Sequence, residues 1–496
     1  MTLANRHFLL VLSAYAANEL LSLAGFLQAG LGTAAAIGIA GLAFALAMAR
    51  LRWAIYLVLA ELFVGGKGYL FSLPLWPSGT LSIRMALFLI VVSVGISQTL
   101  FRLRSKKIPH RSKEVVWSSG FGAILAYGIA HGLAHHPFTQ VFFDANGWLF
   151  ILLLPVVTIA LRDSTVPARL VQLLAGAVVV LGIKSAVLVY LFGHAPSDAL
   201  LPVYQWIRHT GVGEITPVSG SLFRIFFQSH LYGMVGWLVL LTLIVHRAFQ
   251  DWADLAVAGI ALYLGSLSLL ISQSRSLWIG AVAAAALLIG HAMWRRNLGI
   301  APMVLAVGAM VAVLSSQLTV VNLIAGNAQG NVLVARFTDL GLEPAGSSRK
   351  HQLGPLISAI QKHPWLGSGF GQTVTYQSFD PRVMREHPGG WYTTVAFEWG
   401  YLDIALKLGL VGLTVYLIWV ARLVWIGLAR RVETPAAKFA LAAVIGLVGI
   451  AVANIFSPYL NHPLGLGWVM VAVVSLNAVD GTATPVALRQ TSSNRG

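Results

Sequence analysis

Long apolar stretches recur along almost the whole chain, and charged residues, proline or glycine close each of them. Each stretch has about 20 residues, which is the length of helix that crosses the hydrocarbon core of a bilayer. We therefore expect an all-α polytopic membrane protein with about fourteen transmembrane helices. The predicted spans cover residues 8–28, 31–49, 53–71, 84–101, 115–133, 147–161, 170–193, 230–246, 255–272, 276–293, 299–318, 402–421, 438–456 and 464–479.

Basic residues between the spans predict the orientation. The densest basic stretch runs from Arg102 to Lys113, and lysine and arginine concentrate in cytoplasmic loops. Alternating from this stretch places the basic connections at 50–52, 162–169 and 430–431 inside as well. Both termini are then cytoplasmic.

Two segments on the predicted outer side are long, 194–229 and 319–401. The second is a large extracytoplasmic loop, too long for a passive connection and rich enough in aromatic residues to be ordered. Within it, apolar residues at helical spacing predict a short amphipathic helix. They are Leu353, Leu356, Ile357 and Ile360. This helix lies either on the membrane surface or against the protein's own outer face. The Thr/Ser/Asn-rich tail, 480–496, is expected to be disordered.

Composition and charge limit the kinds of functional site that the chain can form. The chain has no cysteine, which excludes disulfides, a thiolate nucleophile and cysteine-ligated zinc. The net charge of +16 is partly explained by the cytoplasmic loops. On the outer side, however, most cations are arginine, whose guanidinium binds phosphate oxygens in a bidentate fork. The alternative to anion binding is that these arginines snorkel, extending their charged ends to the membrane interface. The candidates for an anionic ligand are Arg84, Arg224, Arg275, Arg336, Arg349 and Lys350.

Acidic residues are scarce, so each is informative. Glu398 stands where the large loop re-enters the membrane and can act as a general base; the alternative is a salt bridge to a loop arginine. His387 is the second candidate base. Asp403 and Lys407 are spaced to pair along one helix. The histidines at 135–136 lack a carboxylate nearby, so no metal site is expected.

Four motifs then follow in order along the chain. They are 272–278 opening a span, Ser348-Arg349 heading a short helix, the glycine-rich 363–371, and 402–413 after the long loop. Together they resemble the bacterial O-antigen ligases and O-antigen polymerases over roughly 266–425. This divides the chain into N-terminal transmembrane helices (1–265), the ligase-like region (266–425), C-terminal helices (426–479) and the tail.

The resemblance implies a function and a location. Proteins of this family transfer a glycan from undecaprenyl pyrophosphate to an acceptor glycan on the outer face of the bacterial inner membrane, with no metal, nucleotide or other cofactor. The arginines that contact the pyrophosphate would correspond to Arg275, Arg349 and Arg224. The expected partners are this lipid-linked donor, the acceptor glycan, the bilayer and other membrane proteins of polysaccharide assembly. Nothing points to nucleic acid.

One departure from the family bears on the reaction. The ligases carry His-Asn at the loop's re-entry, where this chain has Glu398-Trp399, eleven residues before Gly409. The change favours a polymerase of O-antigen or exopolysaccharide repeat units, with Glu398 or His387 as base. The alternatives are ligation of the glycan onto the lipid A core of lipopolysaccharide and, more distantly, a polysaccharide flippase. No internal repeat of the kind found in transporters is seen.

Overall fold

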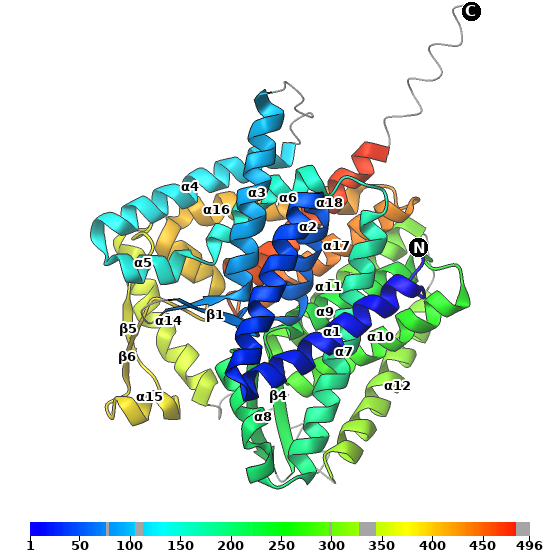
Figure 1. The fold of residues 1–496 in the computed structure, drawn as a ribbon, viewed down its shortest axis with the longest axis horizontal. Helices are drawn as coiled ribbons and strands as arrows, with labels where there is room; N and C mark the ends of the chain where they lie inside the picture. The colour runs from blue at the N-terminus through cyan, green and yellow to red at the C-terminus, as the bar shows by residue number, and fades with distance from the viewer. Residues whose placement is uncertain (76–78, 105–112, 220, 297–299, 327–343, 483–496) are drawn as a thin grey trace, which may run out of the picture.

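The computed structural model describes residues 1–75, 79–104, 113–219, 221–296, 300–326 and 344–482. Within these ranges the chain is a bundle of packed helices (Figure 1). The helices are α1 (Arg6–Leu27), α2 (Ala29–Val64), α3 (Ile83–Arg104), α4 (Lys113–His135), α5 (Phe138–Ala145), η1 (Trp148–Leu152), α6 (Leu153–Ala160), α7 (Val166–His194), α8 (Ser197–His209), α9 (His230–Val245), α10 (Trp252–Ser272), α11 (Arg275–Arg296), α12 (Ile300–Ile324), α14 (Pro344–Lys362), α15 (Pro381–Glu386), α16 (Gly400–Ala429), α17 (Pro435–Ala453), η2 (Tyr459–Asn461) and α18 (Pro463–Thr482).

The all-α polytopic class is confirmed, whereas the count of fourteen spans is not. Among the described residues, eight helices are long and apolar enough to cross a membrane. A ninth is added if α5 and the η1–α6 segment, bent by 55° relative to each other, form one broken span. Shorter apolar helices lie in α9, α12 and α18. The predicted spans 31–49 and 53–71 both fall largely in α2, which breaks at Arg50.

Three small antiparallel hairpins, which hydropathy did not predict, lie in segments expected on the outer side. They pair β1 (Ser72–Leu75) with β2 (Gly79–Ser82), β3 (Gly213–Ser219) with β4 (Leu222–Phe227), and β5 (Val374–Gln377) with β6 (Trp391–Thr394). The register of the third pairs Val374 with Thr394 and Gln377 with Trp391. Figure 1 shows α14, β5, β6 and α15 together at one corner of the molecule, with α15 at the far end of the hairpin.

The core lies where α7, α10 and α17 surround the short helix α9. Twelve of the 16 residues of α9 are buried, and Tyr232 on this helix is fully enclosed. Trp419 and Trp468, on α16 and α18, are also fully buried. A helix that is apolar on all sides needs such an enclosed position, which explains why α9 has no polar face.

The predicted amphipathic helix is confirmed as part of α14. Its Leu356 is fully buried against Val374, Phe397 and Leu406. Its apolar side therefore packs on β5 and on α16, which is the second of the two placements expected from the sequence. Ile357 on the same helix remains 40% exposed.

Helix α16 breaks at Gly409, and the glycine-rich segment 363–371 fills the break. Gly409 has φ 67° and ψ −177°, which is not helical. The N–H groups of Ser368 and Gly369 donate to the carbonyls of Leu406 and Lys407 (2.8 and 3.1 Å). The N–H groups of Leu410 and Val411 donate to the carbonyls of Pro364 and Trp365 (2.8 and 3.2 Å). The backbone groups released by the break thus find partners in the loop, as apolar surroundings require.

We expect Gly409→Ala to destabilise the protein by about 2 kcal/mol or more. An L side chain is strained at this positive φ, and its Cβ would collide with the Trp365 carbonyl. The measurement is thermal unfolding of the purified protein in detergent. Gly354→Ala on α14 is the matched control, because a Cβ there meets open space. Equal unfolding temperatures for the two variants would contradict this view of the break.

Candidate functional site

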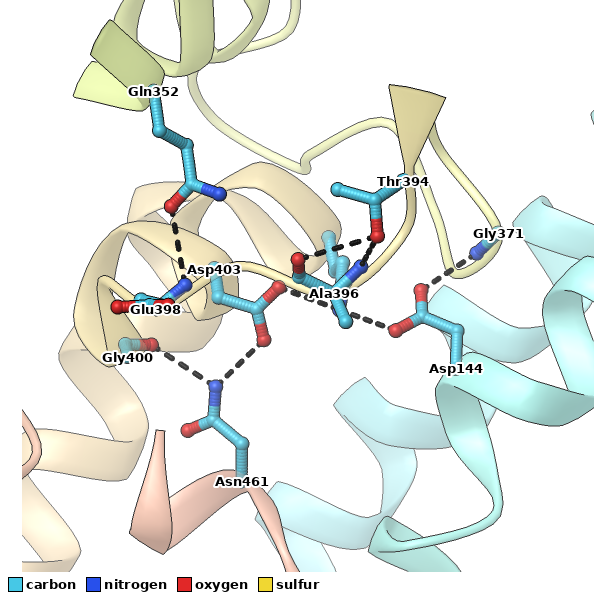
Figure 2. A network of polar contacts seen from close by, with 10 residues as sticks. Asp144, Gln352, Gly371, Thr394, Ala396, Glu398, Gly400, Asp403 and Asn461 are labelled. Atoms are coloured by element: carbon cyan, nitrogen blue, oxygen red, sulfur yellow. Dashed lines mark hydrogen bonds and ion pairs between the residues drawn. The ribbon is translucent and has the colours of Figure 1, made fainter. Parts of the chain in front are cut away.

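The short segment of α16 before its break holds a buried charge cluster. Lys407 forms ion pairs with Asp403 (2.6 Å), the predicted pair along one helix, and with Asp144 of α5. The Asn461 side chain donates to Asp403 (2.7 Å), and the Gly371 N–H donates to Asp144 (2.8 Å). Figure 2 shows the three polar side chains Asp144, Asp403 and Asn461 facing one another from separate elements.

This cluster fixes the backbone around the site. Lys407 and Asp403 are 3% and 4% exposed, and charges at such depth are tolerated only when they are paired and hydrogen-bonded. Because its members come from α5, α16, η2 and the segment before β5, the cluster ties these four elements together. Asn461 also donates to the Gly400 carbonyl (3.0 Å), at the first residue of α16. The position of Glu398, just before that helix, is thereby set.

Glu398 pairs with Arg349. The Arg349 guanidinium of α14 donates to the Glu398 carboxylate, so the structure brings the predicted base together with one of the predicted pyrophosphate ligands. The Glu398 N–H donates to the side chain of Gln352 (3.1 Å), and the Trp399 indole donates to the Arg349 carbonyl (3.1 Å). The two charged side chains are 39% and 47% exposed. They are therefore rigidly held yet open to a ligand.

Arg224 contacts the turn between α10 and α11, at which Arg275 stands. The Arg224 guanidinium donates to the carbonyl of Ser272, the last residue of α10 (2.8 Å). Gln273 then takes a left-handed conformation (φ 49°), and Arg275 begins α11. Arg275 is thus three residues from the carbonyl that Arg224 contacts, at a helix N-terminus whose dipole favours anions.

Tyr459, which was not predicted from the sequence, lies close enough to Arg349 and Arg224 to be affected by their charges. Its loop is joined to the start of α11 by the Ser457 and Ser276 hydroxyls (3.3 Å). Burial raises the pKa of the Tyr459 phenol to about 12, although the positive charges of Arg349 and Arg224 both favour the phenolate. The hydroxyl therefore lies within the field of arginines from α14 and from β4. A tyrosine in a short connection between apolar spans carries no signal that hydropathy could detect.

The remaining predicted residues differ in their surroundings. Arg84 is buried, donates to both carboxylate oxygens of Glu61 (2.8 and 3.0 Å) and to the Gly66 carbonyl (2.7 Å), and so has its guanidinium already occupied. Lys350 is exposed beside Arg349. His387 is exposed in the connection between β5 and β6, beyond the Gln377–Trp391 end of the hairpin, whereas Glu398 follows the opposite end at Thr394. Arg336 lies outside the described residues, as does most of the tail.

No metal centre emerges in the part of the chain that the structure describes. There, no three His, Asp or Glu side chains gather closely enough to hold a metal ion. The rings of His131 and His135 lie 4.4 Å apart, without a carboxylate to complete a site. The groups described above are a carboxylate, a phenol and three guanidinium groups.

Comparison with known proteins adds one finding. Residues 260–417, about a third of the chain, match the family model of the O-antigen ligases. The matched stretch includes Arg275, Arg349 and Glu398, and it overlaps the predicted ligase-like region. No curated protein matches the sequence. The chain is therefore a multi-pass membrane protein with an O-antigen ligase-like region, of the type that acts in polysaccharide biosynthesis.

Proposed function

We propose that this protein is a membrane glycosyltransferase that polymerises oligosaccharide repeat units carried on undecaprenyl pyrophosphate. The observation that carries the proposal is the ion pair between Arg349 and Glu398. It joins a phosphate-binding side chain and a proton acceptor within one site of the ligase-like region. Arg224, Arg275 and Tyr459 supply three further donors around the same place.

The proposed reaction is a single inverting displacement. A hydroxyl oxygen of the acceptor sugar attacks the anomeric carbon of the donor, and Glu398 takes the hydroxyl proton. The bond from that carbon to the pyrophosphate oxygen breaks, and the pyrophosphate leaves with the electron pair. Arg275, Arg224 and Arg349 stabilise the negative charge that develops on it. Binding of the pyrophosphate would draw Arg349 from Glu398 and free the carboxylate for the acceptor.

The proposal includes a location and an orientation. The protein would lie in the bacterial inner membrane with both termini in the cytoplasm. The corner formed by α14, β5, β6 and α15 would then face outward, which is the side on which the lipid-linked donor is used. The positive-inside distribution of lysine and arginine supports this orientation.

Ligation of a finished glycan onto the lipid A core is the second candidate. The family model that matches residues 260–417 is described as O-antigen ligase, which favours the ligase function. Glu398-Trp399 in place of the ligases' His-Asn favours the polymerase.

The glycan that accumulates without the protein distinguishes the two functions. In a strain that lacks the protein, we expect single lipid-linked repeat units to accumulate, since nothing would join them. Lipid extracts would be analysed by mass spectrometry, with a strain complemented by the wild-type protein as control. Accumulation of long lipid-linked chains would instead identify a ligase. An unchanged glycan profile would refute both functions.

A further inference from the structure

A cavity of about 300 Å³ lies beside the site, between the C-terminal half of α14 and the segment that leads into β5. Polar side chains dominate its lining, and none of the lining residues is a carboxylate. The polar members are Ser358, Lys362, His363, Ser368, Gln372, Thr373 and Thr375. The mechanism proposed above uses none of them.

The one charged side chain among the lining residues given above is Lys362. Lys362 is the last residue of α14 and His363 follows it; both are exposed, and neither forms an ion pair with any described residue. A third basic group is close, because the His136 ring contacts the carbonyl of Ser368 (3.2 Å), another lining residue. A lysine ammonium that no carboxylate of the lining neutralises attracts an anionic group, and the two imidazoles can add hydrogen bonds to it.

The opposite wall is suited to sugar hydroxyls. Gln372, Thr373 and Thr375 present amide and hydroxyl groups, each able to donate and to accept hydrogen bonds. This wall is rigid, because Val374 pairs with Thr394 across the hairpin and the Ser368 N–H donates to the Leu406 carbonyl (2.8 Å). A preformed polar surface of this kind lowers the entropic cost of binding a flexible glycan.

One helix connects this cavity to the reaction site. Arg349 and Lys362 both belong to α14, and at 1.5 Å per residue they are roughly 20 Å apart along its axis. A glycan whose reacting end lies at Glu398 could extend several sugars along the outer surface and reach the cavity. The cavity is therefore placed to contact a distant unit of a bound chain.

We propose that this cavity binds an acidic sugar of the glycan substrate, through a uronate carboxylate or a sugar-linked phosphate. The assignment rests on the proposed function, since it places the acidic unit on the same chain that reacts at Glu398. Lys362 and His363 pair with the acid group, and the hydroxyl-rich wall binds the sugar ring. The site would favour acidic repeat units over neutral ones.

The test is binding of fluorescently labelled oligogalacturonate to the purified protein in detergent, with a neutral maltooligosaccharide as the comparison. We expect the acidic probe to bind more tightly and to weaken as salt is raised. Lys362→Ala combined with His363→Ala should weaken it about tenfold or more, the loss typical of a charge-assisted hydrogen bond. Lys362→Arg should keep most of the binding. Arg385→Ala, which removes an exposed cation of α15 in the same outer region, should bind as the wild type does.

Three results with the sugar probes would overturn the proposal. They are equal binding of the two probes, no binding of the acidic probe, and an unchanged affinity in the double variant. If the double variant lost affinity only in nanodiscs that contain phosphatidylglycerol, the cavity would be assigned to a lipid headgroup. That result would also overturn the proposal. The assay needs no turnover, so failure of this cavity and failure of the proposed reaction give different results.

Discussion

Replacing Glu398 by glutamine is expected to lower the rate of glycan extension by about 10²–10⁴-fold, the usual contribution of a general base. Glutamine keeps the shape and can still accept a hydrogen bond from Arg349, but it cannot take a proton from the acceptor hydroxyl. The measurement is turnover per folded molecule with a purified lipid-linked donor. Donor binding should change little, because the arginines that hold the pyrophosphate remain.

A purely structural Glu398 would give a different result. The pair with Arg349 would then serve only stability, and the variant would unfold more easily while its folded molecules worked normally. Glu386→Gln is the matched control, since it alters an exposed acid of the same outer region. Near-normal turnover for Glu398→Gln would exclude the base assignment and direct attention to His387, despite its position at the far end of the hairpin.

Removing either predicted pyrophosphate ligand should be nearly as damaging. Arg275→Ala or Arg349→Ala is expected to lower turnover by about 10²–10³-fold, because each removes a donor to the charge that develops on the leaving group. Lysine at either position should recover little, since a point charge cannot reproduce the guanidinium fork. Turnover would be measured as for Glu398, after thermal unfolding has shown that each variant is folded.

An exchange of charges separates structural from chemical roles at this pair. Arg349→Glu combined with Glu398→Arg keeps the ion pair but moves both functional groups. We expect this double variant to be folded and inactive. Arg385→Ala serves as the control for loss of an outer arginine outside the site. Activity in the exchanged variant, or in both alanine variants, would refute the assignment of these residues to the reaction.

Hydropathy predicted the class of fold well and its details less well. It detects how apolar a segment is, not whether the helix continues through it. The predicted span 147–161 corresponds to η1 and α6, but hydropathy did not reveal α5, which precedes them at a bend of 55°. The boundary predicted between the spans 31–49 and 53–71, by contrast, coincides with the break in α2 at Arg50.

In the site, too, residues in local sequence motifs were predicted, whereas residues joined only by tertiary packing were not. Arg349, Arg275 and Glu398 stand in motifs, so spacing along the chain pointed to them. Asp144 gave no such signal, because its partner Lys407 is 263 residues away and only tertiary packing joins them. Tyr459 was missed for the same reason. Distant partners of this kind become visible only once the helices are placed.

The interlocked break in α16 also restricts how such a chain can change in length. A side chain on Gly367 would meet the backbone of Lys407, and one on Gly409 would meet the backbone of Trp365. Each segment therefore occupies the space that a side chain added to the other would need. An insertion or deletion in either segment would misalign the hydrogen bonds that join 363–371 to α16. Length changes should therefore be confined to the chain that connects these two segments.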